Sequence, residues 1–424
     1  MMKKKFLKFA VVAAILFSAT WITSCSDDDD DDDGDDSTGI ISFENVLETK
    51  DFVQSGTFNM SGSEAAILPG QSVSFTFNAG RGQRLAFATM YGYSNDLFFA
   101  PENPGLDLYT AGGEPLTGDR SLDIKLWDNG TRVNQQPSAE NTHPGIAQSA
   151  DVTRVEGEDA QGNIYLDASE LMKLNLTYNK TRSEFTLTIT NNTSGTINET
   201  PFSPGVWAVS NIWDNYLENN APFFVEGQMS STQMTALAET GDNEPLYDMV
   251  EPMTGILTGI SPVVVVVYTG DVNPLYELNK EDTKIGLSEL AQRGSTSPLV
   301  ESLREMSNVR SIYIAGTQVT GPTEKVEVGF NAVRGDKIAF ATMFTSSNDW
   351  FYSNSSDIDA LSKGDITSKV ALLDDGTAVN QYPGAGNLQA AFGGISEPED
   401  KVIVAVDDTY PVPAVSSVLK VVIR

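Results

Sequence analysis

The chain has 424 residues, of which 58 are acidic and 27 are basic, and its formal net charge at pH 7 is −31. So acidic a surface keeps a protein soluble and suits divalent cations, but it disfavours binding to nucleic acid. The single cysteine, Cys25, excludes an internal disulfide. The chain also has only one histidine, His143, so a zinc site or a histidine-dependent catalytic centre is disfavoured as well.

Residues 1–24 have the pattern of an export signal. Four lysines lie before residue 9, and a mainly apolar stretch follows over residues 9–22. This stretch is too short, and too soon followed by charge, for a transmembrane helix. It ends in Ile22-Thr23-Ser24-Cys25, which resembles the box that lipoprotein signal peptidase reads. We therefore predict a lipoprotein signal peptide over residues 1–24 and a lipid on Cys25 that holds the protein to a membrane. The alternative is an ordinary secretory signal with a chance cysteine.

Residues 25–37 form an acidic segment that begins at this cysteine. Nine aspartates lie between Ser26 and Ser37. Like charges at this density repel one another and bury no apolar surface, so the segment is expected to be a disordered tether. Its position also resembles the surface-export signal of one group of bacterial lipoproteins. We therefore expect an outer-membrane lipoprotein that faces the medium rather than the periplasm.

A long repeat links the early and late parts of the chain. Residues 84–99 (RLAFATMYGYSNDLFF) match residues 337–352 (KIAFATMFTSSNDWFY), and residues 126–135 match residues 372–381. The matched blocks occur in the same order, with Pro137 and Pro383 at the same offset behind them. Blocks that match in the same order indicate an internal duplication.

A second repeat lies in the middle of the chain. Residues 234–241 (MTALAETG) match residues 287–294 (LSELAQRG), and each block is preceded by a Ser-Pro pair that opens an apolar run. The two repeats predict two domains, which we place at residues 38–182 and 183–424. A boundary near residue 257 is the alternative that the repeats leave open.

The periodicity of the chain predicts mainly β structure. Apolar and polar residues alternate over residues 73–77, 184–190 and 325–330, and residues 263–267 form a fully apolar run. Helices are expected over residues 232–239, 285–292 and 298–306, the last with Ser297 as its N-cap, and residues 245–249 also have an apolar helical pattern. Many short strands separated by turns predict an all-β protein of two antiparallel β-sandwich domains with a few short helices.

Several motifs resemble the spondin N-terminal domain family in its bacterial extracellular branch. They are the strand over residues 185–190, the Ser203-Pro204-Gly205-Val206-Trp207 segment, residues 237–242, two Ser-Asn-Asp blocks and two Asp-x-Gly-Thr blocks. Residues 183–390 resemble one whole family unit with its early half doubled, and residues 71–137 resemble the later half alone. The resemblance implies a calcium-binding, C2-like β-sandwich, with animal relatives that act in extracellular matrix and adhesion. The chain departs from the family after each Gly-Thr, where Arg132 and Ala378 replace an aspartate.

The repeated blocks also supply oxygen ligands of the kind that calcium prefers. In each repeat an aspartate is expected just after a strand and before large apolar residues, a second aspartate lies at a turn, and an amide follows six residues later. These candidate ligands are Asp96, Asp128 and Asn134 in the first repeat and Asp349, Asp374 and Asn380 in the second. The alternative is that these residues recur because tight turns need them.

The function that we expect is extracellular binding or adhesion, with a protein or a glycan as the unidentified partner, calcium as the cofactor and no catalysis. A subunit of a surface fibre is an alternative, as is, with less support, a glycan-active hydrolase that uses paired carboxylates. The aromatic residues behind Asp96 and Asp349, namely Phe98, Phe99, Trp350, Phe351 and Tyr352, would be contact residues if exposed. Otherwise they belong to the core.

Overall fold

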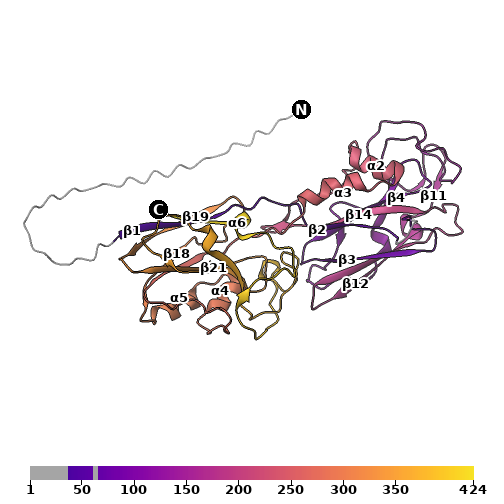
Figure 1. Cartoon of the computed structure of the whole chain (residues 1–424). Helices are drawn as coiled ribbons and strands as arrows, with labels where there is room; N and C mark the ends of the chain where they lie inside the picture. Colours follow the sequence, from indigo (N-terminus) through magenta and orange to yellow (C-terminus); the bar gives the residue numbers. More distant parts are fainter. Residues whose placement is uncertain (1–36, 61–64) are drawn as a thin grey trace, which may run out of the picture. The chain divides into compact units, whose positions relative to one another are not determined.

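The computed structural model describes residues 37–60 and 65–424. The predicted signal peptide, Cys25 and the acidic tether as far as residue 36 lie outside the described residues. Within the described part, no helix is long and apolar enough to cross a membrane. The described strands form two antiparallel β-sandwich bodies with few short helices, which confirms the predicted fold class (Figure 1).

The N-terminal body is built from two antiparallel sheets. The smaller sheet has the order β3 (Ser72–Asn78), β13 (Glu184–Asn191), β12 (Met172–Asn179) and β7 (Gly118–Asp119). The larger sheet has the order β2 (Phe52–Phe58), β14 (Phe202–Ser210), β4 (Arg84–Tyr91), β5 (Leu97–Pro101), β8 (Ile124–Asp128) and β9 (Thr153–Val155), with β6 (Leu106–Asp107) also paired to β4. Helices α2 (Thr232–Thr240) and α3 (Glu244–Val250) pack on the outer face of this larger sheet.

The C-terminal body repeats this plan. Its smaller sheet has the order β19 (Lys325–Ala332), β1 (Ser37–Asn45), β26 (Leu419–Ile423) and β23 (Gly364–Asp365). Its larger sheet has the order β18 (Val309–Ala315), β17 (Val263–Tyr268), β20 (Lys337–Met343), β21 (Trp350–Asn354), β24 (Val370–Asp374) and β25 (Val404–Ala405), with β22 (Ile358–Asp359) paired to β20. Helices α4 (Leu287–Arg293) and α5 (Ser297–Arg304) pack on its outer face.

The remaining elements are short. One-turn helices precede the equivalent strands β12 and β26. One small hairpin lies between β9 and β12, and another follows β14. They are α1 (Ala168–Leu171), α6 (Val415–Val418), β10 (Gly157–Glu158) with β11 (Ile164–Tyr165), and β15 (Ile212–Trp213) with β16 (Tyr216–Leu217).

The first described strand, β1, belongs to the second body. It pairs with β19 and β26, in the same way that β13 pairs with β3 and β12. The expected boundary at residue 183 therefore falls inside the β12–β13 hairpin of the N-terminal body, whereas the alternative near residue 257 lies between α3 and β17. The N-terminal body covers residues 52–255 and is inserted into the C-terminal body behind its first strand. The core of the C-terminal body accordingly includes Leu47 before the insertion and Ile256 after it.

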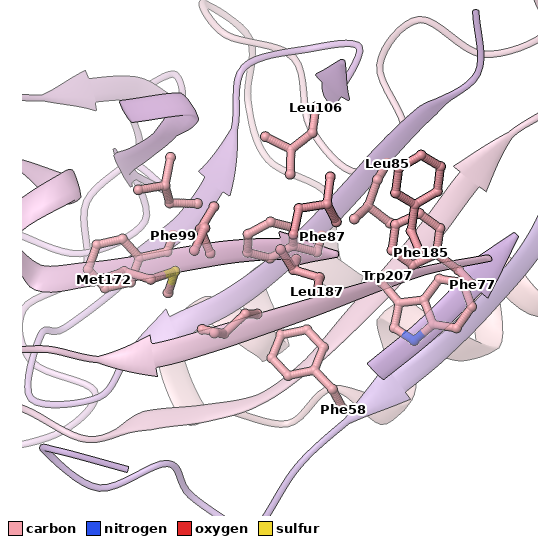
Figure 2. Close-up of a cluster of buried hydrophobic side chains, with 14 of the residues drawn as sticks. Phe58, Phe77, Leu85, Phe87, Phe99, Leu106, Met172, Phe185, Leu187 and Trp207 are labelled. Atoms are coloured by element: carbon pink, nitrogen blue, oxygen red, sulfur yellow. The ribbon is translucent and has the colours of Figure 1, made fainter. Parts of the chain in front are cut away.

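Aromatic side chains fill the core between the sheets of the N-terminal body (Figure 2). The rings of Phe77 and Phe185 stack with their centroids 5.7 Å apart, and Trp207 lies 6.0 Å from Phe77. Along β13 every second residue is buried, including Phe185 and Leu187, as the period of two predicts. Fully burying one side chain of this size stabilises the fold by about 1.5–3 kcal/mol.

The two bodies share specific hydrogen bonds as well as their topology. Met90 donates its backbone N–H to Ser203 Oγ over 2.9 Å, and Met343 donates in the same way to Ser261 over 3.0 Å. These serines belong to the Ser-Pro pairs of the sequence repeat. The positions matched by sequence are thus structurally equivalent, and residues can be compared between the bodies one by one.

The predicted helices form, with one difference at a helix start. Helix α5 begins at Ser297 itself, and the residue before it, Thr296, forms no side-chain cap. Ser297 is therefore the first helical residue rather than the N-cap, because Thr296 already has helical backbone angles. The helix that is capped by a serine is α2, where Ser231 Oγ accepts from the Met234 N–H over 3.1 Å.

Candidate functional site

The six predicted ligands gather at the equivalent end of the larger sheet in each body. Asp96 directly precedes β5 and Asp128 ends β8, and these strands pair so that Leu97 lies opposite Asp128. In the C-terminal body, Trp350 lies opposite Asp374 in the same way. We call Asp96, Asp128 and Asn134 the N-terminal loop cluster. Asp349, Asp374 and Asn380 form the C-terminal loop cluster.

One carboxylate oxygen of the first aspartate holds the following loop. Asp96 Oδ2 accepts from the backbone N–H groups of Thr131 and Arg132, each over 2.8 Å. Asp349 Oδ2 accepts from Thr377 and Ala378 over 2.7 and 2.8 Å. Charge-assisted bonds of this kind are stronger than neutral ones, so each aspartate fixes its Gly-Thr loop against the sheet.

The second aspartate forms the turn itself. Asp128 Oδ1 accepts from the Gly130 N–H over 2.7 Å, and its Oδ2 accepts from Asn134 Nδ2 over 2.6 Å. Asp374 does the same with Gly376 over 2.8 Å and with Asn380 over 2.6 Å. The glycines have positive φ angles of 76° and 71°. The turn chemistry that the sequence allowed as an alternative is therefore present in both clusters.

After the turn hydrogen bonds are made, each cluster still has buried oxygen atoms without a hydrogen-bond donor among the described residues. The buried atoms Asp96 Oδ1 and Asn134 Oδ1 have no hydrogen-bond partner among the described residues. The equivalent atoms Asp349 Oδ1 and Asn380 Oδ1 have none either. An unpartnered buried oxygen costs about 1–3 kcal/mol, more when it is charged. The same pair of atoms is left without a donor in each body.

Burial makes these carboxyls hard to ionise. It raises the pKa of Asp96 to about 7, and the charge of Asp128 adds to the rise. It raises the pKa of Asp349 as well, with Asp374 as the nearby charge. A divalent cation would favour the charged form of both groups.

The comparison with known proteins gives no family. No protein-family model matches the chain, and no similar protein was found among the curated ones. The resemblance to the spondin N-terminal family therefore stays a prediction that rests on the motifs given above.

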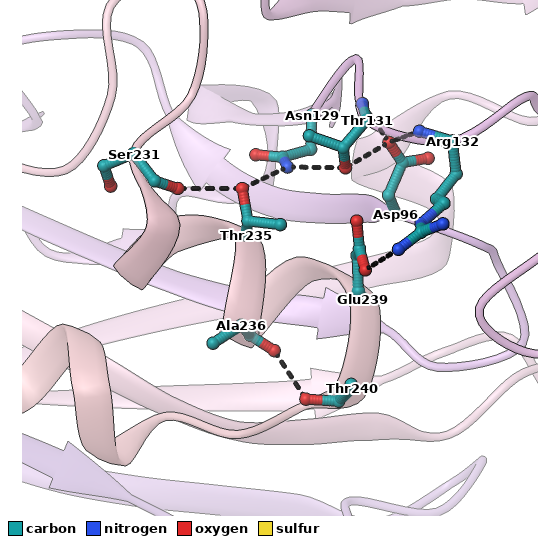
Figure 3. A network of polar contacts seen from close by, with 9 residues as sticks. All are labelled: Asp96, Asn129, Thr131, Arg132, Ser231, Thr235, Ala236, Glu239 and Thr240. Carbon is teal, nitrogen blue, oxygen red and sulfur yellow. Dashed lines mark hydrogen bonds and ion pairs between the residues drawn. The ribbon is translucent and has the colours of Figure 1, made fainter. Parts of the chain in front are cut away.

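The two clusters differ in their neighbours. In the N-terminal body Arg132 Nη2 donates to Glu239 Oε2 of α2 over 2.7 Å, close to Asp96 (Figure 3). The matched residues of the C-terminal body are Ala378 and Gln292, both neutral. The N-terminal loop cluster thus has an internal cation beside it, and its counterpart lacks one at the matched position.

The sequence reasoning missed an acidic residue next to the C-terminal loop cluster. Asp375 follows Asp374 and is fully buried, and burial raises its pKa to about 8, with the charge of Asp282 adding to the rise. The repeat alignment held the signal, because Asp375 stands opposite the neutral Asn129. No three His, Cys, Asp or Glu side chains converge on one point in the part of the chain that the structure describes. A cation there would be bound largely by amide, hydroxyl and carbonyl oxygens and by water.

The structure also shows where the aromatic residues and the single histidine lie. The aromatic residues behind Asp96 and Asp349 are buried, so they belong to the core and are not contact residues. His143 is exposed, in a segment without helix or strand.

Proposed function

We propose that this chain is a lipid-anchored extracellular binding or adhesion protein whose two spondin-like sandwiches present calcium-binding loop clusters. In this proposal, lipid on Cys25 holds it to the outer membrane at the cell surface. The folded part is presented to the medium, where its partner is a protein or a glycan. Calcium orders the loop ends without taking part in a reaction.

The observation that supports a cation at the loop clusters is their repetition. In both bodies the first aspartate and the asparagine each keep one buried oxygen without a donor. Turns alone need neither of these atoms, because the turn bonds are made by the other oxygen or by the amide nitrogen. Calcium is a hard cation that takes oxygen ligands from carboxylates and amides, and it tolerates irregular geometry.

A binding role fits the way in which the carboxylates are used. Asp96 and Asp349 each accept two bonds from backbone N–H groups, which keeps the loops rigid. Rigid loops at the end of a sandwich are a common place for recognition. Catalysis by paired carboxylates would need two such groups facing a substrate across a cleft.

Thermal unfolding tests the calcium proposal. The chain from residue 26, which keeps every described residue, is unfolded after chelation and again with millimolar calcium. A cation that binds only the folded state must raise the melting temperature. We expect a rise that Asp349→Ala and Asn380→Ala reduce, while Asp407→Ala, at an exposed residue that belongs to neither cluster, leaves it intact. An unchanged melting temperature would remove calcium from the proposal.

The membrane anchor has its own test. A labelled fatty acid fed to the expressing bacteria should be incorporated into the protein and should be absent from Cys25→Ser. Surface exposure is then checked with protease on intact cells. An unlabelled wild-type chain would replace the lipoprotein proposal with that of an ordinary secreted protein.

A fibre subunit is a second candidate, because of strand β1. This strand lies near the start of the described chain and yet in the middle of a sheet, between β19 and β26. Strand exchange between subunits uses a terminal strand in such a place. Gel filtration distinguishes the candidates, since a fibre subunit forms concentration-dependent polymers and a binding protein does not.

A further inference from the structure

The C-terminal body has an acidic pocket beside its loop cluster. The pocket has a volume of about 360 Å³ and is lined by five carboxylate and two lysine side chains, with the hydroxyls of Ser288 and Thr377. The carboxylates include Asp282, which precedes α4, and Glu399. Two lysines do not balance five acids, so the pocket favours a cation.

The buried residue Asp375 is joined to this pocket through Thr377. Its Oδ2 accepts from Thr377 Oγ1 over 2.9 Å, and Thr377 lines the pocket. Its Oδ1 is buried and has no partner among the described residues. Leu373, two residues earlier on β24, packs with α4 and α5, so Asp375 follows on the helix-covered face of the sheet. Asp282 is the charged group that, after burial, contributes most to raising the pKa of Asp375.

The N-terminal body has a neutral side chain at the same place. There Asn129 replaces Asp375, and its Nδ2 donates to Thr131 Oγ1 over 3.0 Å and to Thr235 Oγ1 over 3.1 Å (Figure 3). Thr235 corresponds to Ser288 in the sequence repeat. Asn129 Oδ1, like Asp375 Oδ1, has no hydrogen-bond partner among the described residues. The matched positions therefore differ in charge, because a neutral amide stands in one body and a carboxylate in the other.

The charged residues next to Asn129 and Asp375 also differ between the two bodies. Arg132 and Glu239 form an ion pair beside Asn129 in the N-terminal body, as Figure 3 shows. At the matched positions the C-terminal body has Ala378 and Gln292, and Gln292 Nε2 donates to Thr377 Oγ1 over 3.0 Å. The C-terminal body has therefore gained a buried carboxylate and lost a guanidinium at this place. A buried carboxylate without a counter-charge is costly, and a cation from solvent would supply one.

We propose that this pocket binds a divalent cation, with Asp375 and Asp282 as carboxylate ligands and the hydroxyls of Ser288 and Thr377 beside them. All of these groups offer oxygen, which is the ligand of calcium and magnesium rather than of zinc. The ligands differ from those of the loop clusters, so this site goes beyond the proposed function. We expect no such site in the N-terminal body, because Asn129 is neutral and Arg132 supplies a positive charge nearby.

Calcium titration calorimetry on the chelated chain from residue 26 tests the site. The variant Asp375→Asn introduces the residue that the other body carries, so it is expected to fold. We expect Asp375→Asn and Asp282→Asn each to lose one equivalent of calcium, or to bind it at least tenfold more weakly. We also expect Asp375→Asn to melt at least as high as the wild type in chelator, because a buried charge is removed.

The comparison variant is Asn380→Ala, which alters the loop cluster and leaves Asp375 and Asp282 in place. If Asp375→Asn and Asp282→Asn bind calcium with wild-type stoichiometry and affinity, the pocket site is overturned, whatever Asn380→Ala does. If those two variants lose an equivalent that Asn380→Ala keeps, the pocket site stands, even where the loop cluster binds nothing. A wild-type chain that binds no calcium overturns both proposals.

Discussion

Arg132 donates from Nη2 to Glu239 Oε2 over 2.7 Å, and this contact ties the Gly-Thr loop of the N-terminal body to helix α2. The equivalent contact in the C-terminal body joins neutral groups, Gln292 and Thr377, over 3.0 Å. One duplicated scaffold therefore fixes the same loop with an ion pair in one body and with an uncharged hydrogen bond in the other.

Removing the ion pair should destabilise the N-terminal body. Arg132→Ala leaves Glu239 largely buried without its partner, and we expect a loss of about 1–3 kcal/mol in the free energy of unfolding. The double variant Arg132→Ala with Glu239→Gln copies the pair found in the C-terminal body and should lose less than the single variant. Denaturant unfolding measures both. Equal losses in the free energy of unfolding would mean that the ion pair with Arg132 does not stabilise the buried charge of Glu239.

The turn glycine Gly376 should not tolerate a side chain. Its φ angle is +71°, and a Cβ atom would lie 2.7 Å from the backbone oxygen of Lys401. Gly335 has a φ of +94° but no atom within 4 Å of the corresponding position. Both Gly→Ala changes incur the cost of a left-handed backbone, about 1–2 kcal/mol, and only Gly376→Ala adds a clash. We expect Gly376→Ala to be the more destabilising in urea unfolding. Similar losses would show that the loop relaxes around the new methyl group.

The insertion of one body into the other predicts the effect of truncation. A chain that begins at residue 46 lacks β1 and leaves β19 and β26 without their shared neighbour. Hydrogen exchange should therefore become fast in β19 and β26 and remain slow in β13 and β14. A chain that begins at residue 36 is the control, and a peptide of residues 37–45 should restore protection. Slow exchange throughout the truncated chain would contradict the assignment of β1 to the C-terminal body.

Asp96 predicts a pH dependence in the absence of metal. Burial raises its pKa to about 7, so the folded state binds the proton more tightly than the unfolded chain does. Its contribution to stability is full below the unfolded pKa of about 4 and is lost as the pH rises through 7. In chelator, the free energy of unfolding should therefore fall between pH 5 and pH 8.

Two variants check this sign. Asp96→Asn should flatten the fall between pH 5 and pH 8. Asp119→Asn should not, because hydrogen bonds from Ser121 lower the pKa of Asp119 and this group stays charged across that window in both states. A slope that is unaffected by Asp96→Asn would mean that Asp96 titrates normally in the fold.

The alternation of apolar residues predicted individual strands such as β13 and β19, and the many short strands between turns predicted the fold class. It could not predict the chain order of the two bodies. The apolar residues of β1 indicate a strand, but period-two alternation carries no information on which strand lies beside it. The repeats were also compatible with a boundary in the β12–β13 turn, since the early block and the late block recur on both sides of it.

The sequence alone predicted only part of the candidate site. The sequence placed Asp128 at a turn with Asn134 six residues later, and the direct hydrogen bond between them shows that the two side chains meet. Asp375 was missed, because its significance depends on burial, on Asp282 nearly a hundred residues away and on the loss of the arginine that its counterpart Asn129 has nearby. Long-range electrostatics of this kind follow from the packing of α4 against the sheet and not from local sequence.

The most direct measurement is a crystal structure of the chain grown with calcium chloride. The account predicts a calcium ion in the C-terminal loop cluster, with Asp349 Oδ1 and Asn380 Oδ1 among oxygen ligands at about 2.3–2.6 Å. An anomalous signal at that point would identify the ion. Density for water alone between these two atoms, in crystals that hold calcium elsewhere or nowhere, would contradict the proposed calcium-binding function of the loop clusters.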